Sequence, residues 1–286
     1  MNMLILGASG FIGRNMKRYF ERSYEIDAPS HRKLDILDEH AVKKYFAANS
    51  YDVVVNCLDE VNGDHYFENR LRMHLNLQKY SDWYGKMIYY GSGAEYDRFQ
   101  DLRNVSENEL DTVIPRDTYG FCLQQLNRCS QNSTNIYNLR LFGIYGEHEL
   151  WAKRFISNAI CKVLYGYPIT IRQDRKMDYL YIEDLCRMTE WIINAIPQRH
   201  DYNAVTGQGV YLSEIAKMIV DIAKKDVPIY IAKEGNAFEY TGSNQALLEE
   251  IGDFDYIQMK TAIERMIVFY QEHLSEIDGE KLLYQS

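Results

Sequence analysis

The stretch Gly7-Ala8-Ser9-Gly10-Phe11-Ile12-Gly13 decides the fold of this 286-residue chain. It follows the apolar run 3–6, which is typical of a buried strand, and it opens a segment at 11–22 whose apolar residues recur at helical spacing. The glycines allow a tight turn and let a pyrophosphate approach the backbone, while the helix N-terminus offers free N–H groups. This pattern predicts a dinucleotide-binding turn. Its predicted cofactor-binding residues are Gly7, Ser9, Gly10, Phe11, Ile12, Gly13 and Arg14.

The composition excludes several classes of protein. The chain is 46% hydrophobic and 26% charged, which is ordinary for a globular protein. Its 32 basic and 41 acidic residues give a net charge of −9, which argues against nucleic acid or an anionic membrane as the partner. No apolar run reaches the ~18–20 residues of a membrane helix, and the first thirteen residues lack the basic region of a signal peptide.

The cysteines and histidines bear on compartment and metal binding. The five cysteines form no CxxC pair, which indicates thiols in a reducing, cytoplasmic compartment. The seven histidines show neither HxxxH nor HExxH spacing, so no metal site is expected.

Strand and helix patterns alternate along the first half. Strands are predicted at 24–26, 52–56, 86–90 and 136–141, and helices at 37–49, 65–84 and 119–131. This alternation indicates βαβ units with right-handed crossovers. We therefore predict an α/β fold whose residues 1–145 form a Rossmann-type, doubly wound parallel sheet that binds a dinucleotide.

The pattern changes after residue 145. Helices are predicted at 151–165, 182–196, 213–225 with Ser213 as the N-cap, and 261–274. These indicate a smaller, helix-rich substrate domain over residues 146–286, with the chain crossing back to the sheet near 176–205. The polar segment 97–118 is predicted to be a long loop beside the site.

Several motifs, in order along nearly the whole chain, resemble those of the extended short-chain dehydrogenase/reductase family, also called the NAD-dependent epimerase/dehydratase family. Besides the glycine-rich turn, residues 90–96 resemble its serine/threonine segment. Residues 140–146 resemble its R-x-x-N-x-Y-G stretch with Gly143 in place of Asn, and residues 178–184 resemble a later stretch preceded by Met177 in place of Arg. The likeness is strongest to the nucleotide-sugar reductases of the family.

The resemblance implies further cofactor contacts. Asp35 and Ile36 would lie at the adenine ring, and Cys57 and Leu58 close to the cofactor. At the end of the second strand, an acid commonly binds a ribose 2′-OH whereas basic residues accept a 2′-phosphate. The candidate acid is Asp27, and the candidate cations are Arg14, His31, Arg32 and Lys33. The segment resembles that of an NADPH enzyme of the family, which favours NADP(H) over NAD(H).

The resemblance also implies catalytic positions. In the family a tyrosine is the acid/base, a lysine four residues later lowers its pKa and holds the nicotinamide ribose, and a serine or threonine bonds the same substrate oxygen. Tyr119 and Ser92 occupy the tyrosine and serine positions, but Leu123 replaces the lysine. Arg116 and Arg128 are candidate substitutes, although Arg128 lies nine residues beyond Tyr119.

Two hypotheses follow. The first is a nucleotide-sugar 4-keto reductase or epimerase whose nucleotide-diphosphate sugar is held by residues 150–175. Candidate diphosphate ligands there are Lys153, Arg154, Arg172 and Arg175. The second is a non-catalytic homologue that binds a dinucleotide or sugar nucleotide, since Leu123 replaces the lysine.

Two further expectations complete the sequence-based picture. Dehydration is disfavoured because Gly93 and Ala94 stand where dehydratases carry Asp-Glu, and Glu95 should point elsewhere. Apolar residues in the helical patterns near 67–84 and 261–274 would allow a homodimer.

Overall fold

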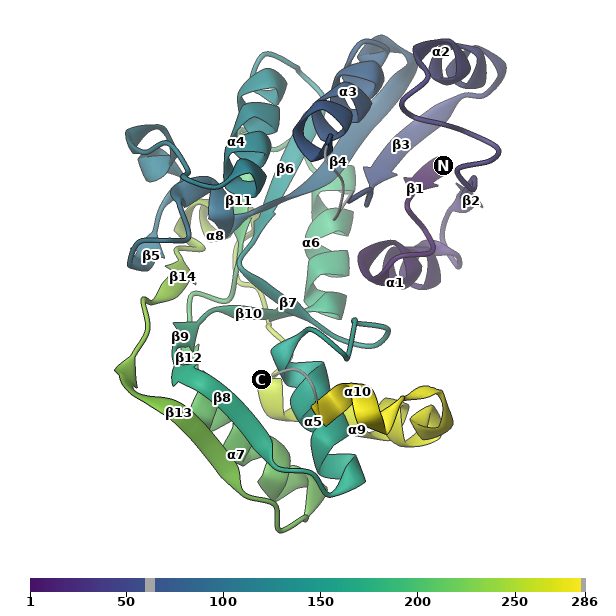
Figure 1. The fold of residues 1–286 in the computed structure, drawn as a ribbon. Coiled ribbons are helices and arrows are strands. Elements are labelled where there is room, and N and C mark those ends of the chain that lie inside the picture. Colours follow the sequence, from purple (N-terminus) through teal and green to yellow (C-terminus); the bar gives the residue numbers. More distant parts are fainter. Residues whose placement is uncertain (60–64, 284–286) are drawn as a thin grey trace.

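A computed structural model describes residues 1–59 and 65–283. Its centre is a parallel six-stranded sheet with the strand order β11-β6-β4-β3-β1-β2 (Figure 1). The chain moves one way from β1 to β2 and the other way through β3, β4 and β6, so the order reverses at β1. Ligands of such sheets bind at this reversal, outside the carboxyl ends of the strands. The strands are β1 (Asn2–Leu6), β2 (Glu25–Asp27), β3 (Tyr51–Asn56), β4 (Tyr84–Ser92), β6 (Ile136–Leu141) and β11 (Asp201–Ala204).

Helices cover both faces of the sheet (Figure 1). Side chains alternate along β1, so Met3 and Ile5 join one hydrophobic core while Leu4 and Leu6 join another. The first core includes residues of α1 (Phe11–Phe20) and α6 (Ile182–Asn194). The second includes residues of α2 (Glu39–Ala48), α3 (Tyr66–Gln78) and α4 (Thr118–Ser130). The predicted doubly wound Rossmann-type sheet is confirmed.

The C-terminal half packs at the carboxyl edge of the sheet (Figure 1). Its helices are α5 (Phe155–Tyr165), α7 (Leu212–Ala223), α8 (Gln245–Ile251), α9 (Met259–Glu272) and α10 (Gly279–Leu283). The paired strands β8 (Ile169–Asp174) and β13 (Ile229–Asn236) run beside them. Between β8 and α7 the chain returns to the sheet through α6 and β11.

The polar segment 97–118 has more structure than the loop that was predicted. It contains β5 (Leu102–Val105) and a 3₁₀ helix at Glu107–Thr112. β5 pairs with β14 (Tyr240–Gly242), so its partner lies far along the chain and local periodicity could not reveal it. The same small sheet contains β9 (Lys176–Met177) and β12 (Val210–Tyr211), and β7 (Gly143–Tyr145) pairs separately with β10 (Tyr179–Tyr181).

Helix ends differ from prediction by one or more residues, and three of them have a clear structural reason. α3 stops at Gln78 rather than 84, because Ser81–Trp83 forms a 3₁₀ turn before β4. α5 starts at Phe155 rather than 151, because a separate turn precedes it in which the Lys153 amide bonds the Leu150 carbonyl. α7 starts at Leu212, and the Ser213 hydroxyl donates to Asp174 (2.5 Å) instead of capping the helix.

We also searched the described residues for membrane-spanning helices and for clusters of metal ligands. Within residues 1–59 and 65–283, no helix has the length and apolarity needed to cross a membrane. In the same ranges, no three His, Cys, Asp or Glu side chains gather as a metal site would require.

Candidate active site

The glycine-rich turn has no room for side chains where β1 passes into α1. Gly7 has φ +75°, and a Cβ there would lie 2.8 Å from the Cys57 carbonyl oxygen. A Cβ on Gly13 would lie 2.2 Å from the Gly7 carbonyl oxygen. Gly10 is the N-cap of α1 and makes no side-chain cap, so the first N–H groups of the helix remain available to an anion. The turn therefore fits a pyrophosphate.

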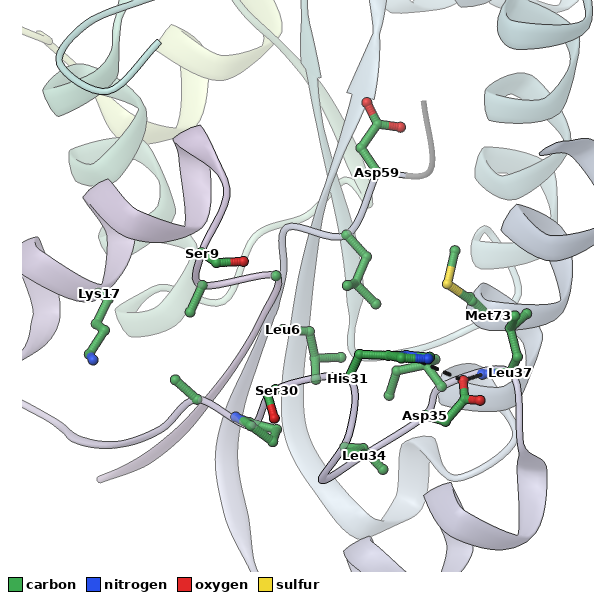
Figure 2. Close-up of a pocket in the computed structure, with 16 residues that line it drawn as sticks. Leu6, Ser9, Lys17, Ser30, His31, Leu34, Asp35, Leu37, Asp59 and Met73 are labelled. Carbon is green, nitrogen blue, oxygen red and sulfur yellow. Dashed lines mark hydrogen bonds and ion pairs between the residues drawn. The ribbon is translucent and has the colours of Figure 1, made fainter. Parts of the chain in front are cut away.

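A cavity of about 610 Å³ opens beside this turn (Figure 2). Gly7, Ser9 and Ile36 line it together with Asp35. The Asp35 carboxylate accepts a hydrogen bond from the Leu37 amide (2.9 Å) and lies 3.7 Å from His31 Nδ1. We call it the adenosine cavity, since its size and position suit that half of a dinucleotide.

Asp27, the acid predicted to bind the 2′-OH of the adenosine ribose, is bonded to other protein groups. Asp27 accepts hydrogen bonds from Tyr45 (2.5 Å), Tyr51 (2.6 Å) and Lys33 (3.3 Å). Burial opposes its ionisation, but these bonds outweigh burial and lower the pKa of Asp27. The Asp27 carboxylate is therefore engaged by protein donors and lies outside the described lining of the adenosine cavity.

Among the candidate cations, the structure brings His31 to this cavity but not Arg14 or Arg32, as far as its described lining goes. Arg14 contacts His148 Nδ1 (3.4 Å) and the Ser9 carbonyl (3.4 Å), and it lines a different hollow. Lys17, which sequence reasoning missed, lines the adenosine cavity across from His31 (Figure 2). Its position one helical turn after Gly13 is the signal that could have found it.

A second cavity of about 260 Å³ adjoins the first, since Leu58 and Asp59 line both. We call it the catalytic cavity. Ser92 reaches it from the end of β4 and Tyr119 from the first turn of α4. Ile12 and Cys57 also line it, so most of the predicted site residues face one of these two adjoining cavities.

Tyr119 is held in its protonated form. Burial raises its pKa, and the charge of Asp59 raises it further. A hydrogen bond with Ser92 and the charges of Arg70 and Arg154 act in the opposite direction without cancelling these effects. The phenol therefore carries a proton at neutral pH and is suited to donate it.

The three departures from the family motifs have clear structural settings. Leu123 is 1% exposed and belongs to the hydrophobic core between α4 and the sheet. A Cβ on Gly143 would lie 2.7 Å from the Tyr179 ring, so that ring fills the space of a side chain at 143. Met177 lines the catalytic cavity beside Tyr179.

Glu95 points away from the catalytic cavity. Its carboxylate accepts hydrogen bonds from the Ser92 amide (3.0 Å) and from Arg140 Nε (2.8 Å), and both Glu95 and Arg140 are fully buried. Glu95 therefore stabilises the turn that contains Ser92.

The lining of the catalytic cavity includes a buried acid that sequence reasoning missed. Glu149 is 5% exposed, accepts a hydrogen bond from the Ser157 hydroxyl, and has its pKa raised by burial to about 8. No sequence signal marks it, because its burial depends on tertiary contacts. Lys153 and Arg154 line the same wall.

Two of the predicted diphosphate ligands face elsewhere. Arg172 is exposed on β8, and Arg175 donates to the Phe238 carbonyl (2.6 Å) with its guanidinium 5.0 Å from the Tyr240 ring centroid. Neither lies in the described lining of the catalytic cavity.

Comparison with known proteins agrees with this geometry. Residues 3–204 match the profile of the NAD dependent epimerase/dehydratase family. The chain belongs to this family. The resemblance and the fold class expected from the sequence are both confirmed, and the family depends on a nicotinamide dinucleotide.

Individual relatives are distant. ADP-L-glycero-D-manno-heptose-6-epimerase of Pseudomonas aeruginosa is 24% identical, over 77% of this chain and 78% of that protein. The structure of a GDP-L-fucose synthetase from Naegleria fowleri bound to NADP has a TM-score of 0.81 at 16% identity, covering 96% of this chain and 94% of that one. UDP-glucose 4-epimerase from Thermotoga maritima, solved with UDP-glucose, has a TM-score of 0.80 at 16% identity, covering 96% and 100%.

Proposed function

We propose that this chain is an NADP(H)-dependent oxidoreductase that reduces the 4-keto group of a nucleotide-diphosphate sugar, with Tyr119 as the proton donor. One observation carries the proposal. Ser92 and Tyr119, from separate elements, face one cavity that shares the lining residues Leu58 and Asp59 with the cavity of the glycine-rich turn.

The chemistry follows from the protonation state of Tyr119. A bound reduced nicotinamide would supply the hydride. Tyr119 would give its proton to the carbonyl oxygen, and the Ser92 hydroxyl would hydrogen-bond the same oxygen. Epimerisation would instead begin with removal of a hydroxyl proton, for which the raised pKa of Tyr119 is unfavourable, so reduction is the better-supported reaction.

The preference for NADP(H) rests on the charges around the adenosine cavity. Asp27 is already bonded to Tyr45, Tyr51 and Lys33, so it is a poor ligand for ribose hydroxyls. Lys17 and His31 line the cavity and are suited to a 2′-phosphate.

The substrate class rests on two basic residues that line the catalytic cavity. Lys153 and Arg154, at the start of α5, present two cations to an anionic ligand, as a diphosphate requires. UDP-glucose bound to the Thermotoga maritima epimerase is a ligand of this class. Glu95 is fully buried and paired with Arg140, so it is not available to remove a proton in a dehydration.

The test is NADPH oxidation by the purified chain with a panel of 4-keto nucleotide-diphosphate sugars, followed by absorbance at the nicotinamide band. Turnover that falls by about 10²–10⁴-fold in Tyr119→Phe, with NADPH affinity unchanged, would support the proposal. Turnover that is unchanged in Tyr119→Phe would refute the role of Tyr119.

A second candidate is a homologue that binds the dinucleotide without catalysis. It is favoured by Leu123, which places a core side chain where the family has its lysine. Tight NADPH binding with no turnover on any sugar of the panel would select it.

A further inference from the structure

The family lysine places a positive charge near the catalytic tyrosine, and in this chain α4 provides no cation that could replace it. The basic residue in the last turn of that helix is Arg128, which is exposed and contacts Asp111 (3.5 Å). Leu123 is enclosed in the core. Arg116 pairs with Asp97 (2.7 Å) and Arg98, 5.5 Å from the Tyr119 ring centroid, pairs with Asp117 (3.2 Å). Neither of them is in the described lining of the catalytic cavity.

Arg70, on the neighbouring helix α3, does lie in that lining. It is 6% exposed and lines the catalytic cavity together with Tyr119 and Ser92. Tyr66, one turn earlier on α3, has its ring centroid 6.1 Å from that of Tyr119, so this face of α3 is packed against the catalytic residue. The charge of Arg70 acts on both tyrosines and on Cys122 of α4.

The guanidinium of Arg70 has unused hydrogen-bonding capacity. Its ion pair with Asp59 is 3.8 Å long, beyond hydrogen-bond range, and Asp59 is itself 43% exposed at its side chain. Arg70 Nε is buried and has no hydrogen-bond partner among the described residues, and the same holds for the Tyr66 hydroxyl. A guanidinium carries five N–H donors, and leaving buried donors unbonded is unfavourable, which indicates that a ligand uses them.

We propose that Arg70 is a cofactor-binding residue that donates hydrogen bonds to the ribose hydroxyls on the nicotinamide side of the dinucleotide. The adenosine cavity suits one half of the cofactor, and Leu58 and Asp59 line both it and the cavity where Arg70 lies, so we place the other half in that second cavity. Ribose hydroxyls are acceptors that match a guanidinium. The same charge favours ionisation of Tyr119, and thus offsets part of the opposing effect of Asp59. This inference rests on the proposed dinucleotide dependence, but not on the identity of the sugar.

The test compares a whole dinucleotide with its adenosine half. Calorimetric titration of wild type, Arg70→Met and Arg70→Lys would use NADPH and adenosine 2′,5′-bisphosphate, and in parallel NADH and ADP. We expect Arg70→Met to weaken binding of the preferred dinucleotide at least tenfold. The adenosine fragment of that dinucleotide should bind to Arg70→Met with an affinity within twofold of wild type. Arg70→Lys, which keeps the charge but loses the planar fork, should weaken the dinucleotide less.

The matched control is Arg72→Met, because Arg72 is an exposed arginine on the same helix, in contact with Glu68. It should bind all four ligands as wild type does. Equal dinucleotide affinity in wild type and Arg70→Met would overturn the proposal, as would a parallel loss of fragment binding, which would indicate a general structural defect. If Arg70→Met does not fold, the same comparison is made with Arg70→Lys: its dinucleotide affinity should fall relative to wild type, while its fragment affinity should not.

The outcome is separable from that of the proposed function. A wild-type chain that binds NADPH through Arg70 yet reduces no sugar would contradict the reductase and retain the Arg70 assignment. A chain that binds neither dinucleotide would contradict both.

Discussion

The two adjoining cavities differ in how the chain builds them. The adenosine cavity depends on backbone: at Gly7 and Gly13 a single added carbon would strike a carbonyl oxygen. The catalytic cavity depends on side chains, and there the chain departs from its family at Leu123, Gly143 and Met177. Where the backbone itself contacts the cofactor, the residue type can hardly change. The positive charge of a missing lysine, by contrast, can be supplied by a residue of another helix. The comparison teaches that loss of a motif residue is a weaker sign of lost function than loss of a turn glycine would be.

The largest effect on dinucleotide binding is expected from Gly13→Ala. Its Cβ would lie 2.2 Å from the Gly7 carbonyl oxygen, so the turn must shift, at a cost of about 1–3 kcal/mol in the free energy of unfolding. We expect dinucleotide binding to be lost in calorimetric titration. Gly85→Ala is the control, because its Cβ would lie 2.3 Å from the Asp52 carbonyl oxygen, a similar clash at the start of β4 and outside the described lining of both cavities. If Gly13→Ala bound as tightly as Gly85→Ala, the backbone account of the first cavity would be wrong.

Restoring the family lysine tests the second cavity. Leu123 is 1% exposed, so Leu123→Lys should lower the free energy of unfolding by about 3–5 kcal/mol through an unpaired buried charge. Leu123→Met, which conserves volume, should cost less than about 1.5 kcal/mol. Chemical denaturation measures both. A stable Leu123→Lys variant would show that the position still tolerates a cation.

Glu149→Gln tests the buried acid through pH. The folded carboxyl stays protonated up to about pH 8, whereas in the unfolded chain it ionises above its ordinary value of 4.5. Between these values the unfolded state holds fewer protons, so the free energy of unfolding falls as pH rises, by at most about 1.4 kcal/mol per unit. The variant should remove this slope in denaturation curves between pH 5 and 8. Glu234→Gln, at an exposed position, should leave it in place, and an unaltered slope in Glu149→Gln would disprove the assignment.

The smallest effect is expected at the entrance of the adenosine cavity. Lys17→Ala should weaken NADPH binding about tenfold, equivalent to about 1.4 kcal/mol, and leave NADH unchanged. Its neighbour Arg18 is also exposed on α1 but lies outside the described lining of that cavity, so Arg18→Ala should change neither. Equal losses of affinity for NADPH and NADH would show that Lys17 does not bind the 2′-phosphate.

The positions of Ser92 and Tyr119 were predicted from the family resemblance. Local pattern predicted the sheet and the glycine turn, because each depends on residues close in sequence. It did not predict Arg70, Glu149 or Lys17. Arg70 acts from a helix that meets α4 only in the folded chain, and Glu149 has a raised pKa because distant segments bury it. β5 was missed for the same reason, since its partner β14 lies more than a hundred residues later.

The order of the lining residues along the chain has a consequence for folding. All the described lining of the adenosine cavity comes from residues 6 to 73, whereas that of the catalytic cavity extends to Tyr179. Domains fold as they emerge during synthesis, and local contacts form before distant ones. A nascent chain of 73 residues would thus contain the whole described lining of the adenosine cavity, while β4, β6 and β11 and most of the described lining of the catalytic cavity remain to be translated.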